Sequence, residues 1–325
     1  MIWMNIYEDK GMKVLKKENK FVSLVVYLHN AENEIGNFLK TVLPVFEDNF
    51  MQFEIICVDD GCTDGTVERL KEYLDKNQAS VMVNIVHMSF FHGLEGAMNA
   101  GRDLAIGDFI YEFDHVFVDY PIEILLRVYQ KVLEGNDIVA AGSNSRVRLS
   151  PRIFYCFYNK TNRGRGKIGP ETFRIVSRRA VNRVKSIGQY IPYRKAVYSN
   201  CGLRTAVVPY IATETTKKKQ YAGERVSLAL DSFIYFTNAL ETISLTVCGL
   251  FLLLTIGMGI YIVRDYLCND SIVEGWLSTM GFMAAGFFGV FALLTIILKY
   301  LSVILNLIFK RQRYLIADIE KVVKK

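Results

Sequence analysis

Residues 53–66 read FEIICVDDGCTDGT, and this stretch decides the fold. Its first six residues are mostly apolar, which is typical of a strand buried on both faces of a sheet. The strand ends at Asp59 and Asp60, and Thr63 or Asp64 is a suitable N-cap for a helix that follows at once. The stretch therefore predicts a buried strand, a polar turn and a helix.

The same alternation continues on both sides of this stretch. Helical patterns begin at Asn30, the expected N-cap of the first helix, and at a run rich in small residues over 93–106. Further buried strands are predicted at 21–28, 81–87 and 109–113. Regular alternation of this kind predicts a mostly parallel sheet with right-handed crossovers.

Three aspartates fall where these strands end. Ligands of such sheets bind beyond the carboxyl ends of the strands, and Asp59, Asp60 and Asp114 all lie there. Taken singly, Asp59 or Asp64 is explained as a turn residue, because aspartate is common in turns. Three carboxylates at one edge of the sheet nevertheless indicate a site.

The C-terminal third changes character. Residues 243–263 and 276–298, the latter extendable to 309, are long apolar runs without charge up to 298. Each suffices to cross a bilayer as a helix, which takes about 20 residues. A buried core helix would explain either run alone, but two in succession favour two transmembrane helices. Residues 224–242 have an amphipathic pattern, which fits either a juxtamembrane helix or a core helix.

Charges beside these runs predict their orientation. The connection 264–275 is net acidic, whereas the tail 310–325 and Lys217 to Lys219 are basic. The positive-inside rule then places the large domain and the tail in the cytosol, with 264–275 outside a plasma (inner) membrane.

Composition also bears on the partners of the chain, the use of its cysteines and the nature of its N-terminal segment. The formal net charge is +6, and its lysines and arginines form no single stripe, so we expect no nucleic-acid partner. None of the six cysteines has metal-ligand spacing, and buried thiols in a reducing compartment explain them. Residues 1–20 have no apolar stretch and predict a leader rather than a signal peptide, with Met1 or Met12 as the start.

Seven segments, in this order, resemble those of glycosyltransferase family 2, and in particular its polyprenyl-phosphate branch, which acts on dolichyl or bactoprenyl phosphate. They are LHNAENE (28–34), VDDGCTDGT (58–66), HGLEGAMNAG (92–101), AIGDFI (105–110), DHVFVDYP (114–121), FRIVSRRAV (173–181) and KRQRYLI (310–316). The resemblance implies an α/β GT-A domain, Rossmann-like with a mostly parallel sheet, over 21–223, followed by the two transmembrane helices.

The resemblance also implies an activity and partners. An inverting transferase of this family would move a sugar from a nucleotide sugar to a polyprenyl phosphate lipid at the cytosolic membrane face, for cell-surface glycan synthesis. A flippase would pass on the product, and the spans would pack into a homo-oligomer. A different lipid acceptor, or a non-catalytic membrane scaffold or regulator that retains the fold, are the alternatives.

Family motifs assign roles to individual residues. Asp60 would hold the nucleotide base, with Asp59, His29 and Asn30 completing the donor site, and Asp114 and Asp119 would be catalytic. Mg²⁺ or Mn²⁺ would bind the donor diphosphate through Asp114, because hard cations take oxygen ligands. The acceptor phosphate would meet arginines, which orient it through forked hydrogen bonds, or these arginines form a solvated basic face. They are Arg146, Arg148, Arg152, Arg174 and Arg178.

The sequence departs from the family at the metal motif. Val116 stands where the second aspartate of D-x-D is expected, and Glu214 stands where a phosphate-binding arginine is expected. Either basic side chains neutralise the diphosphate and a metal is bound weakly or not at all, or the transferase activity has been lost.

Overall fold

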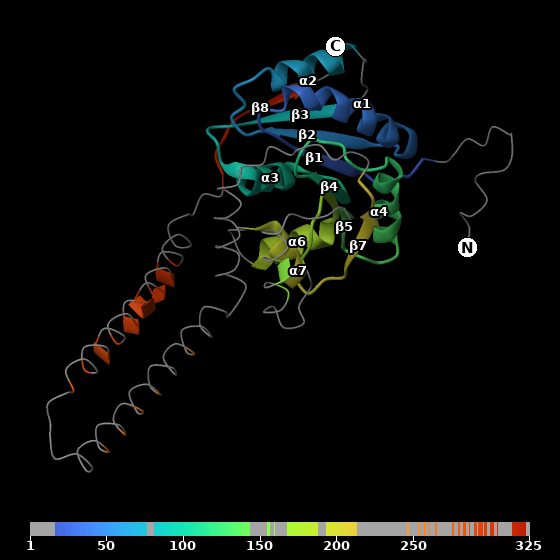
Figure 1. Cartoon of the computed structure of the whole chain (residues 1–325). Helices are drawn as coiled ribbons and strands as arrows, with labels where there is room; N and C mark the ends of the chain where they lie inside the picture. Colours follow the sequence, from blue (N-terminus) through green and yellow to red (C-terminus); the bar gives the residue numbers. More distant parts are fainter. Residues whose placement is uncertain are drawn as a thin grey trace.

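The computed structural model describes residues 17–76, 81–143, 168–187, 193–212 and 314–322, together with isolated positions at 155–156, at 159 and between 246 and 304. Within this part of the chain, the centre of the molecule is one mixed sheet of eight strands (Figure 1). Their order is β7-β5-β6-β4-β1-β2-β3-β8. The expected α/β fold with a mostly parallel sheet is confirmed.

The four predicted strands form the middle of this sheet. They are β1 (Val22–Leu28), β2 (Phe53–Asp59), β3 (Met82–Met88) and β4 (Phe109–Phe113). β1 pairs in parallel with both β2 and β4, and β2 pairs in parallel with β3. The carboxyl ends of all four strands therefore face the same edge of the sheet.

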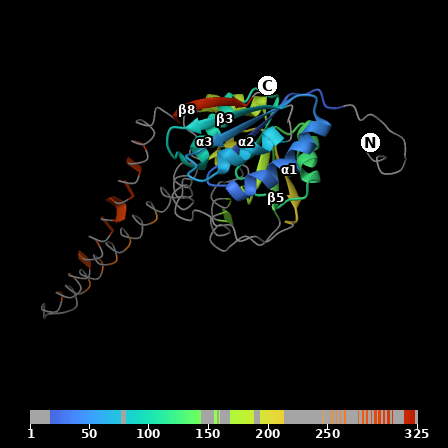
Figure 2. The ribbon, with the colours of Figure 1, turned by 90° about the horizontal axis from the view of Figure 1, so that it is seen from above.

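Four further strands extend the sheet on both sides and were not predicted. They are β5 (Ile138–Ser143), β6 (Phe173–Ser177), β7 (Thr205–Tyr210) and β8 (Ile316–Val322). β6 runs antiparallel to both β4 and β5, while β7 is parallel to β5. At the opposite edge, β8 runs antiparallel to β3 (Figures 1 and 2). The segment expected as a basic tail thus supplies a strand of the main sheet.

Helices cover the two faces of the sheet. One hydrophobic core lies under α1 (Glu32–Asn49), α2 (Thr66–Lys76) and α4 (Glu123–Leu133). A second core lies under α3 (Gly93–Leu104), α6 (Arg178–Ile187) and α7 (Arg194–Asn200). Side chains of β1 alternate between these cores, which explains why this strand is apolar at almost every position.

The first helix begins one residue later than expected. Asn30 has a φ of 49°, in the left-handed region, and Ala31 is the N-cap of α1. The prediction that Asn30 caps this helix is therefore wrong. Because Ala31 has no side-chain acceptor, the α1 terminus is capped from the β2–α2 turn. Thr66 Oγ1 accepts from the Ala31 amide at 2.8 Å, and Asp64 Oδ2 accepts from the Glu32 amide at 3.1 Å.

Helix α3 lies unusually close to the sheet. A Cβ added at Gly101 would come within 2.5 Å of Val25 Cγ1 and 2.6 Å of Val58 Cγ2. Only glycine fits this contact without a shift of the neighbours. The small residues in the predicted helix 93–106 are thus explained by close packing against β1 and β2.

Several segments predicted from the sequence fall on parts of the chain that are not described. The expected spans 243–263 and 276–298, the segment 224–242 and the loop 264–275 lie there wholly or largely. In the part of the chain that the structure describes, no helix has the length and apolar content needed to cross a membrane. At the other end, Glu18 pairs with Phe50 beside the sheet, so the ordered domain extends into the expected leader 1–20.

Candidate active site

Asp60 is held rigidly at the carboxyl end of β2. Its side chain is completely buried, and both carboxylate oxygens accept hydrogen bonds. The Tyr27 hydroxyl donates to Oδ2 at 3.1 Å, and the His92 amide donates to Oδ1 at 2.7 Å. Burial raises the pKa of Asp60 above its ordinary value, although these two hydrogen bonds act in the opposite direction.

The other expected donor-site residues surround Asp60. His29 Nδ1 lies 2.8 Å from the Asp60 carbonyl oxygen, and its ring centroid lies 4.7 Å from that of Phe91. The Asn30 side-chain oxygen accepts from the Thr63 amide at 2.8 Å, so it joins the β1 end to the β2–α2 turn. The structure therefore brings His29, Asn30 and Asp60 together.

Asp59 and Asp64 serve the turn itself, as expected for each taken singly. Asp59 Oδ1 accepts from the Cys62 amide at 2.9 Å, and its other oxygen lies 2.8 Å from His87 Nδ1. Asp64 Oδ1 accepts from the Thr66 amide at 3.1 Å at the start of α2. Both carboxylates thus fix the backbone that carries Asp60.

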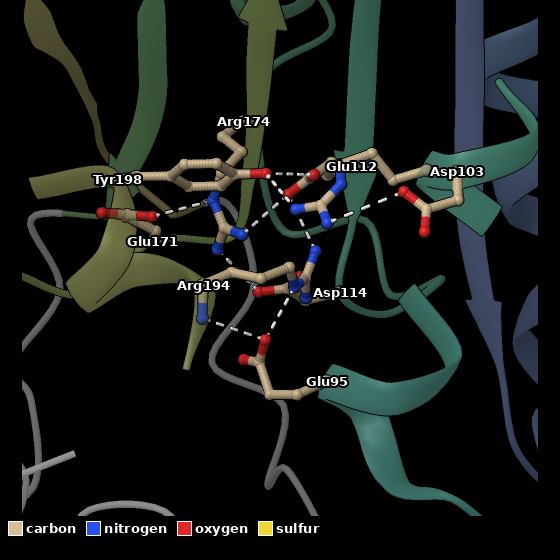
Figure 3. A network of polar contacts seen from close by, with 9 residues as sticks. Glu95, Asp103, Glu112, Asp114, Glu171, Arg174, Arg194 and Tyr198 are labelled. Carbon is tan, nitrogen blue, oxygen red and sulfur yellow. Dashed lines mark hydrogen bonds and ion pairs between the residues drawn. The ribbon is translucent and has the colours of Figure 1, made fainter. Parts of the chain in front are cut away.

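Asp114, at the end of β4, lies in a buried network of ion pairs (Figure 3). Arg174 Nη2 donates to Asp114 Oδ2 at 2.9 Å, and Arg194 Nη2 donates to Oδ1 at 2.7 Å. The same two guanidinium groups also donate to Glu112 Oε2, at 3.0 and 2.8 Å. Two arginines thereby bind two carboxylates from one strand.

Further residues complete the charge balance around the two arginines. Glu95, in the first turn of α3, binds Arg194 Nε at 2.8 Å, and Glu171 binds Arg174 Nε at 3.1 Å. The Tyr198 hydroxyl donates to Glu112 Oε1 at 2.6 Å and accepts from Arg102 at 3.2 Å. Figure 3 shows these side chains meeting from β4, β6, α3 and α7.

The arginines change the protonation behaviour of both carboxyl groups. Burial alone would raise the pKa of Asp114 and of Glu112. The two adjacent guanidinium groups outweigh burial, so both pKa values lie below their ordinary values. Asp114 and Glu112 are therefore ionised at neutral pH, as the counter-ions of Arg174 and Arg194.

The residues at Asp114 do not fit a side-chain metal site. Both oxygens of its carboxylate are bound by guanidinium groups, and the second aspartate of the family motif is replaced by the buried Val116. Among the described residues, no group of three or more His, Cys, Asp or Glu side chains is placed to hold a metal ion. Positive charge next to Asp114 comes from arginine instead.

The remaining catalytic candidate, Asp119, lies in the loop after β4. Its side chain is buried, and Oδ1 accepts from the Tyr210 hydroxyl at 2.9 Å. Tyr210 belongs to β7, so this contact joins the loop to the far side of the sheet. The described contacts place Asp119 with Tyr210.

Two of the five arginines expected at the acceptor phosphate are described. Arg174 is 1% exposed and is bound to three carboxylates. Arg178 donates to the carbonyl oxygens of Ala105 and Gly107, which fixes the loop before β4. Both therefore have structural partners. Arg146, Arg148 and Arg152 lie outside the described residues.

The sequence carries a signal for part of this network. Glu112 lies within the buried strand β4 and Arg174 within the buried strand β6. Buried charges are costly unless they are paired, so one charge in each strand predicts an ion pair. The register confirms this, since Glu112 is directly opposite Arg174. Arg194, Glu95 and Tyr198 had no comparable signal, because they come from helices distant in the sequence.

The first turn of α3 links the two aspartate sites. The amide of His92, the N-cap of α3, binds Asp60, and Glu95 in the first turn binds Arg194, which holds Asp114. β2 and β4 are also the two neighbours of β1. Asp60 and Asp114 therefore lie at the same carboxyl edge of the sheet, the edge at which α/β proteins bind ligands.

Comparison with known proteins agrees with this geometry. A bactoprenol glucosyl transferase of Shigella phage SfX is 29% identical over 227 residues, covering 67% of this chain and 72% of that protein. An uncharacterized glycosyltransferase of Synechocystis sp. is 27% identical over 315 residues, covering 92% and 95%. A mannosyltransferase from Pyrobaculum calidifontis, solved with GDP-Man and Mn²⁺, shares the fold with a TM-score of 0.51 at 14% identity, covering 93% of this chain and 92% of that one.

The family assignment rests on the domain that carries the site. The family described as Glycosyl transferase family 2 matches residues 23–187, which is half of the chain and includes Asp60, Glu112, Asp114 and Arg174. This chain belongs to glycosyl transferase family 2 and is a glycosyltransferase.

Proposed function

We propose that this glycosyltransferase moves a sugar from a nucleotide sugar to a polyprenyl phosphate at the cytosolic face of the plasma membrane, for cell-surface glycan synthesis. The observation that carries the proposal is Asp60, an ionisable carboxyl group clamped by Tyr27 and His92 at the ligand-binding edge of the sheet. A carboxylate fixed in this way is suited to accept a hydrogen bond from an N–H group of a nucleotide base.

The lipid acceptor is proposed from the relatives. Several are named bactoprenol glucosyl transferases, and the one from Shigella phage SfV matches 80% of this chain at 28% identity. A polyprenyl phosphate is already an anion, so its attack on the sugar needs little help from a general base. Cationic side chains that orient the phosphate matter more. We propose Arg146, Arg148 and Arg152 for this task.

Exposed apolar side chains support the membrane location. The described positions between 246 and 304 include Leu253 and Ile260, which are 67% and 65% exposed, and Ile297, which is 59% exposed. All three are helical. Apolar side chains of this size that face outward along a helix are expected where lipid rather than water is the solvent.

The C-terminal segment limits how far the donor site can lie from the bilayer. The second proposed span extends to 309 at most, and Leu315 is hydrogen-bonded to His92 beside Asp60. Six fully extended residues cover at most about 20 Å. If the span does extend to 309, Leu315 and the bound His92 lie within about 20 Å of the end of the span, which keeps the donor site near the bilayer.

A transfer assay on membranes tests the proposal. Membranes containing the full chain are incubated with radiolabelled UDP- or GDP-sugars and polyprenyl phosphate, and the lipid fraction is counted. We expect label in the lipid from one of these donors, and less than about 1% of that rate for Asp60→Ala at equal expression and membrane insertion. Absence of labelled lipid with every donor, or wild-type rates in Asp60→Ala, would overturn the proposal.

A triple variant tests the acceptor arginines separately. Replacing Arg146, Arg148 and Arg152 by alanine should raise the KM for polyprenyl phosphate while the KM for the nucleotide sugar stays unchanged. The exposed Arg69→Ala is the matched control, since it also removes a positive charge but lies on α2. An unchanged lipid KM in the triple variant would remove these arginines from the acceptor site.

A further inference from the structure

The C-terminal segment contacts the loop that covers Asp60. This loop, Ser89–His92, joins β3 to α3. The Ser89 amide donates to the Leu315 carbonyl at 3.0 Å, and the Leu315 amide donates back to His92 Nε2 at 3.1 Å. Residue 315 is thereby bound to both ends of the loop.

His92 connects Leu315 to Asp60. Its ring accepts from Leu315, while its own amide donates to Asp60 Oδ1 at 2.7 Å. Because Nε2 accepts a hydrogen bond, the ring proton is on Nδ1, which faces the Phe90 carbonyl. The ring also stacks on Phe90, with 4.0 Å between the centroids, so its orientation is fixed.

Three further contacts hold the same segment in place. Glu320 on β8 pairs with Lys71 at 2.7 Å and lies 3.6 Å from His87 Nε2, and His87 in turn binds Asp59. The Tyr314 hydroxyl donates to Asp103 Oδ2 at 2.9 Å at the end of α3. Residues before and within β8 thus contact α2, β3 and α3, and through His87 they reach Asp59.

The loop also determines the shape of the space beside Asp60. A Cβ at Gly61, whose φ is +68°, would lie 3.6 Å from the Phe91 backbone nitrogen. The Phe91 ring lies against His29, and Asp60 beneath the loop is completely buried. Any movement of Ser89–His92 therefore changes both the orientation of the Asp60 carboxylate and access to it.

We propose that the segment Tyr314–Val322 is part of the donor site, and that His92 is a positioning residue through which Leu315 holds Asp60 in its binding orientation. The inference rests on the proposed role of Asp60 in binding the nucleotide. It assigns a function to a segment that follows the expected spans and lies far in sequence from the family 2 region at 23–187. A preorganised carboxylate binds its ligand without a further ordering cost.

Steady-state kinetics of the full-length protein in membranes test this role. In His92→Leu we expect the KM for the nucleotide sugar to rise at least fivefold, with kcat within twofold of wild type. His92→Gln, whose side-chain oxygen replaces Nε2 as an acceptor, should recover most of the wild-type KM. The exposed Lys131→Ala, whose side chain pairs with Glu134 on the same surface, is the control and should leave both constants unchanged.

A second variant removes the donor of the same hydrogen bond. Leu315→Pro lacks the amide that donates to His92, and it should raise the donor KM to a similar extent. Since both changes delete one contact, the double variant should be no worse than either single variant. Additive effects, or a wild-type donor KM in His92→Leu, would overturn the inference. Failure of the wild-type protein to transfer from any nucleotide sugar would instead refute the proposed function.

Discussion

Arg174 on β6 lies directly opposite Glu112 on β4, and its guanidinium donates to that carboxylate at 3.0 Å. It also reaches Asp114, two residues further along the same face of β4, at 2.9 Å. Because side chains two apart on a strand point to the same side, one forked cation can bind both carboxylates. Arg194 repeats this from α7. At the end of β4, the buried arginines and carboxylates are therefore paired with one another.

Removing either arginine should be strongly destabilising. Arg194→Ala leaves Glu95, Glu112 and Asp114 without one of their cations inside the protein, where loss of one ion-pair partner costs about 3–5 kcal/mol. The measurement is thermal or denaturant unfolding of the purified protein in detergent. Arg69→Ala on the surface, with a side chain that is 59% exposed, should cost less than about 1 kcal/mol. Equal effects of the two changes would contradict the buried network.

Low pH should reduce the stability of the fold through this network. The folded-state pKa of Asp114 lies below its ordinary value of 3.8, so its ion pairs stabilise the fold above that pH. This stability is lost as the pH falls below about 4 towards the folded-state pKa. We expect the Tm of Asp114→Asn to be lower than that of wild type at pH 7, with the difference becoming smaller as the pH falls below about 4.

The exposed Asp75→Asn, on α2, is the matched control for this pH series. It removes a carboxylate without touching the network, so its curve should follow that of wild type. A constant difference between Asp114→Asn and wild type from pH 7 to pH 3 would show that Asp114 does not contribute through its charge.

Alanine substitutions at two glycines should change the free energy of unfolding in opposite directions. Gly101→Ala places a Cβ against Val25 and Val58 in the α3 contact, and overpacking of this kind costs about 1–3 kcal/mol. Gly36→Ala on α1 meets nothing within 4 Å, so it should stabilise the protein by about 0.5–1 kcal/mol through better helix propensity. Unfolding measurements on both variants check the sign, and stabilisation by Gly101→Ala would contradict the close packing.

Transfer should be only weakly sensitive to chelation. Asp114 is bound on both oxygens by arginine and Val116 replaces the second aspartate, so the described residues offer no side-chain metal site. We expect at least half of the transfer rate to remain in excess EDTA. A complete loss of rate that Mn²⁺ or Mg²⁺ restores would show that a metal binds with the donor in another way.

Local sequence patterns determined much of the fold. Apolar runs and turn residues predicted β1 to β4, α2 and α3 to within a few residues, since burial on both faces leaves a continuous apolar stretch. The order of the motifs also indicated the family, and the carboxyl edge that holds Asp60 followed from parallel strand order. The cap of α1 was wrong at Asn30, because the acceptors come from Asp64 and Thr66 on another turn.

Tertiary structure alone decided which charges meet. No local pattern could reveal that Arg194, 80 residues beyond Asp114, completes its network, or that Leu315 reaches His92. Periodicity reports how one segment buries its own side chains, whereas these contacts depend on the strand order that brings β6 and β8 to the sheet. The sequence determined a buried sheet with aspartates at one edge; only the folded chain decided that one aspartate is bound by two arginines and the other is held by the C-terminal segment.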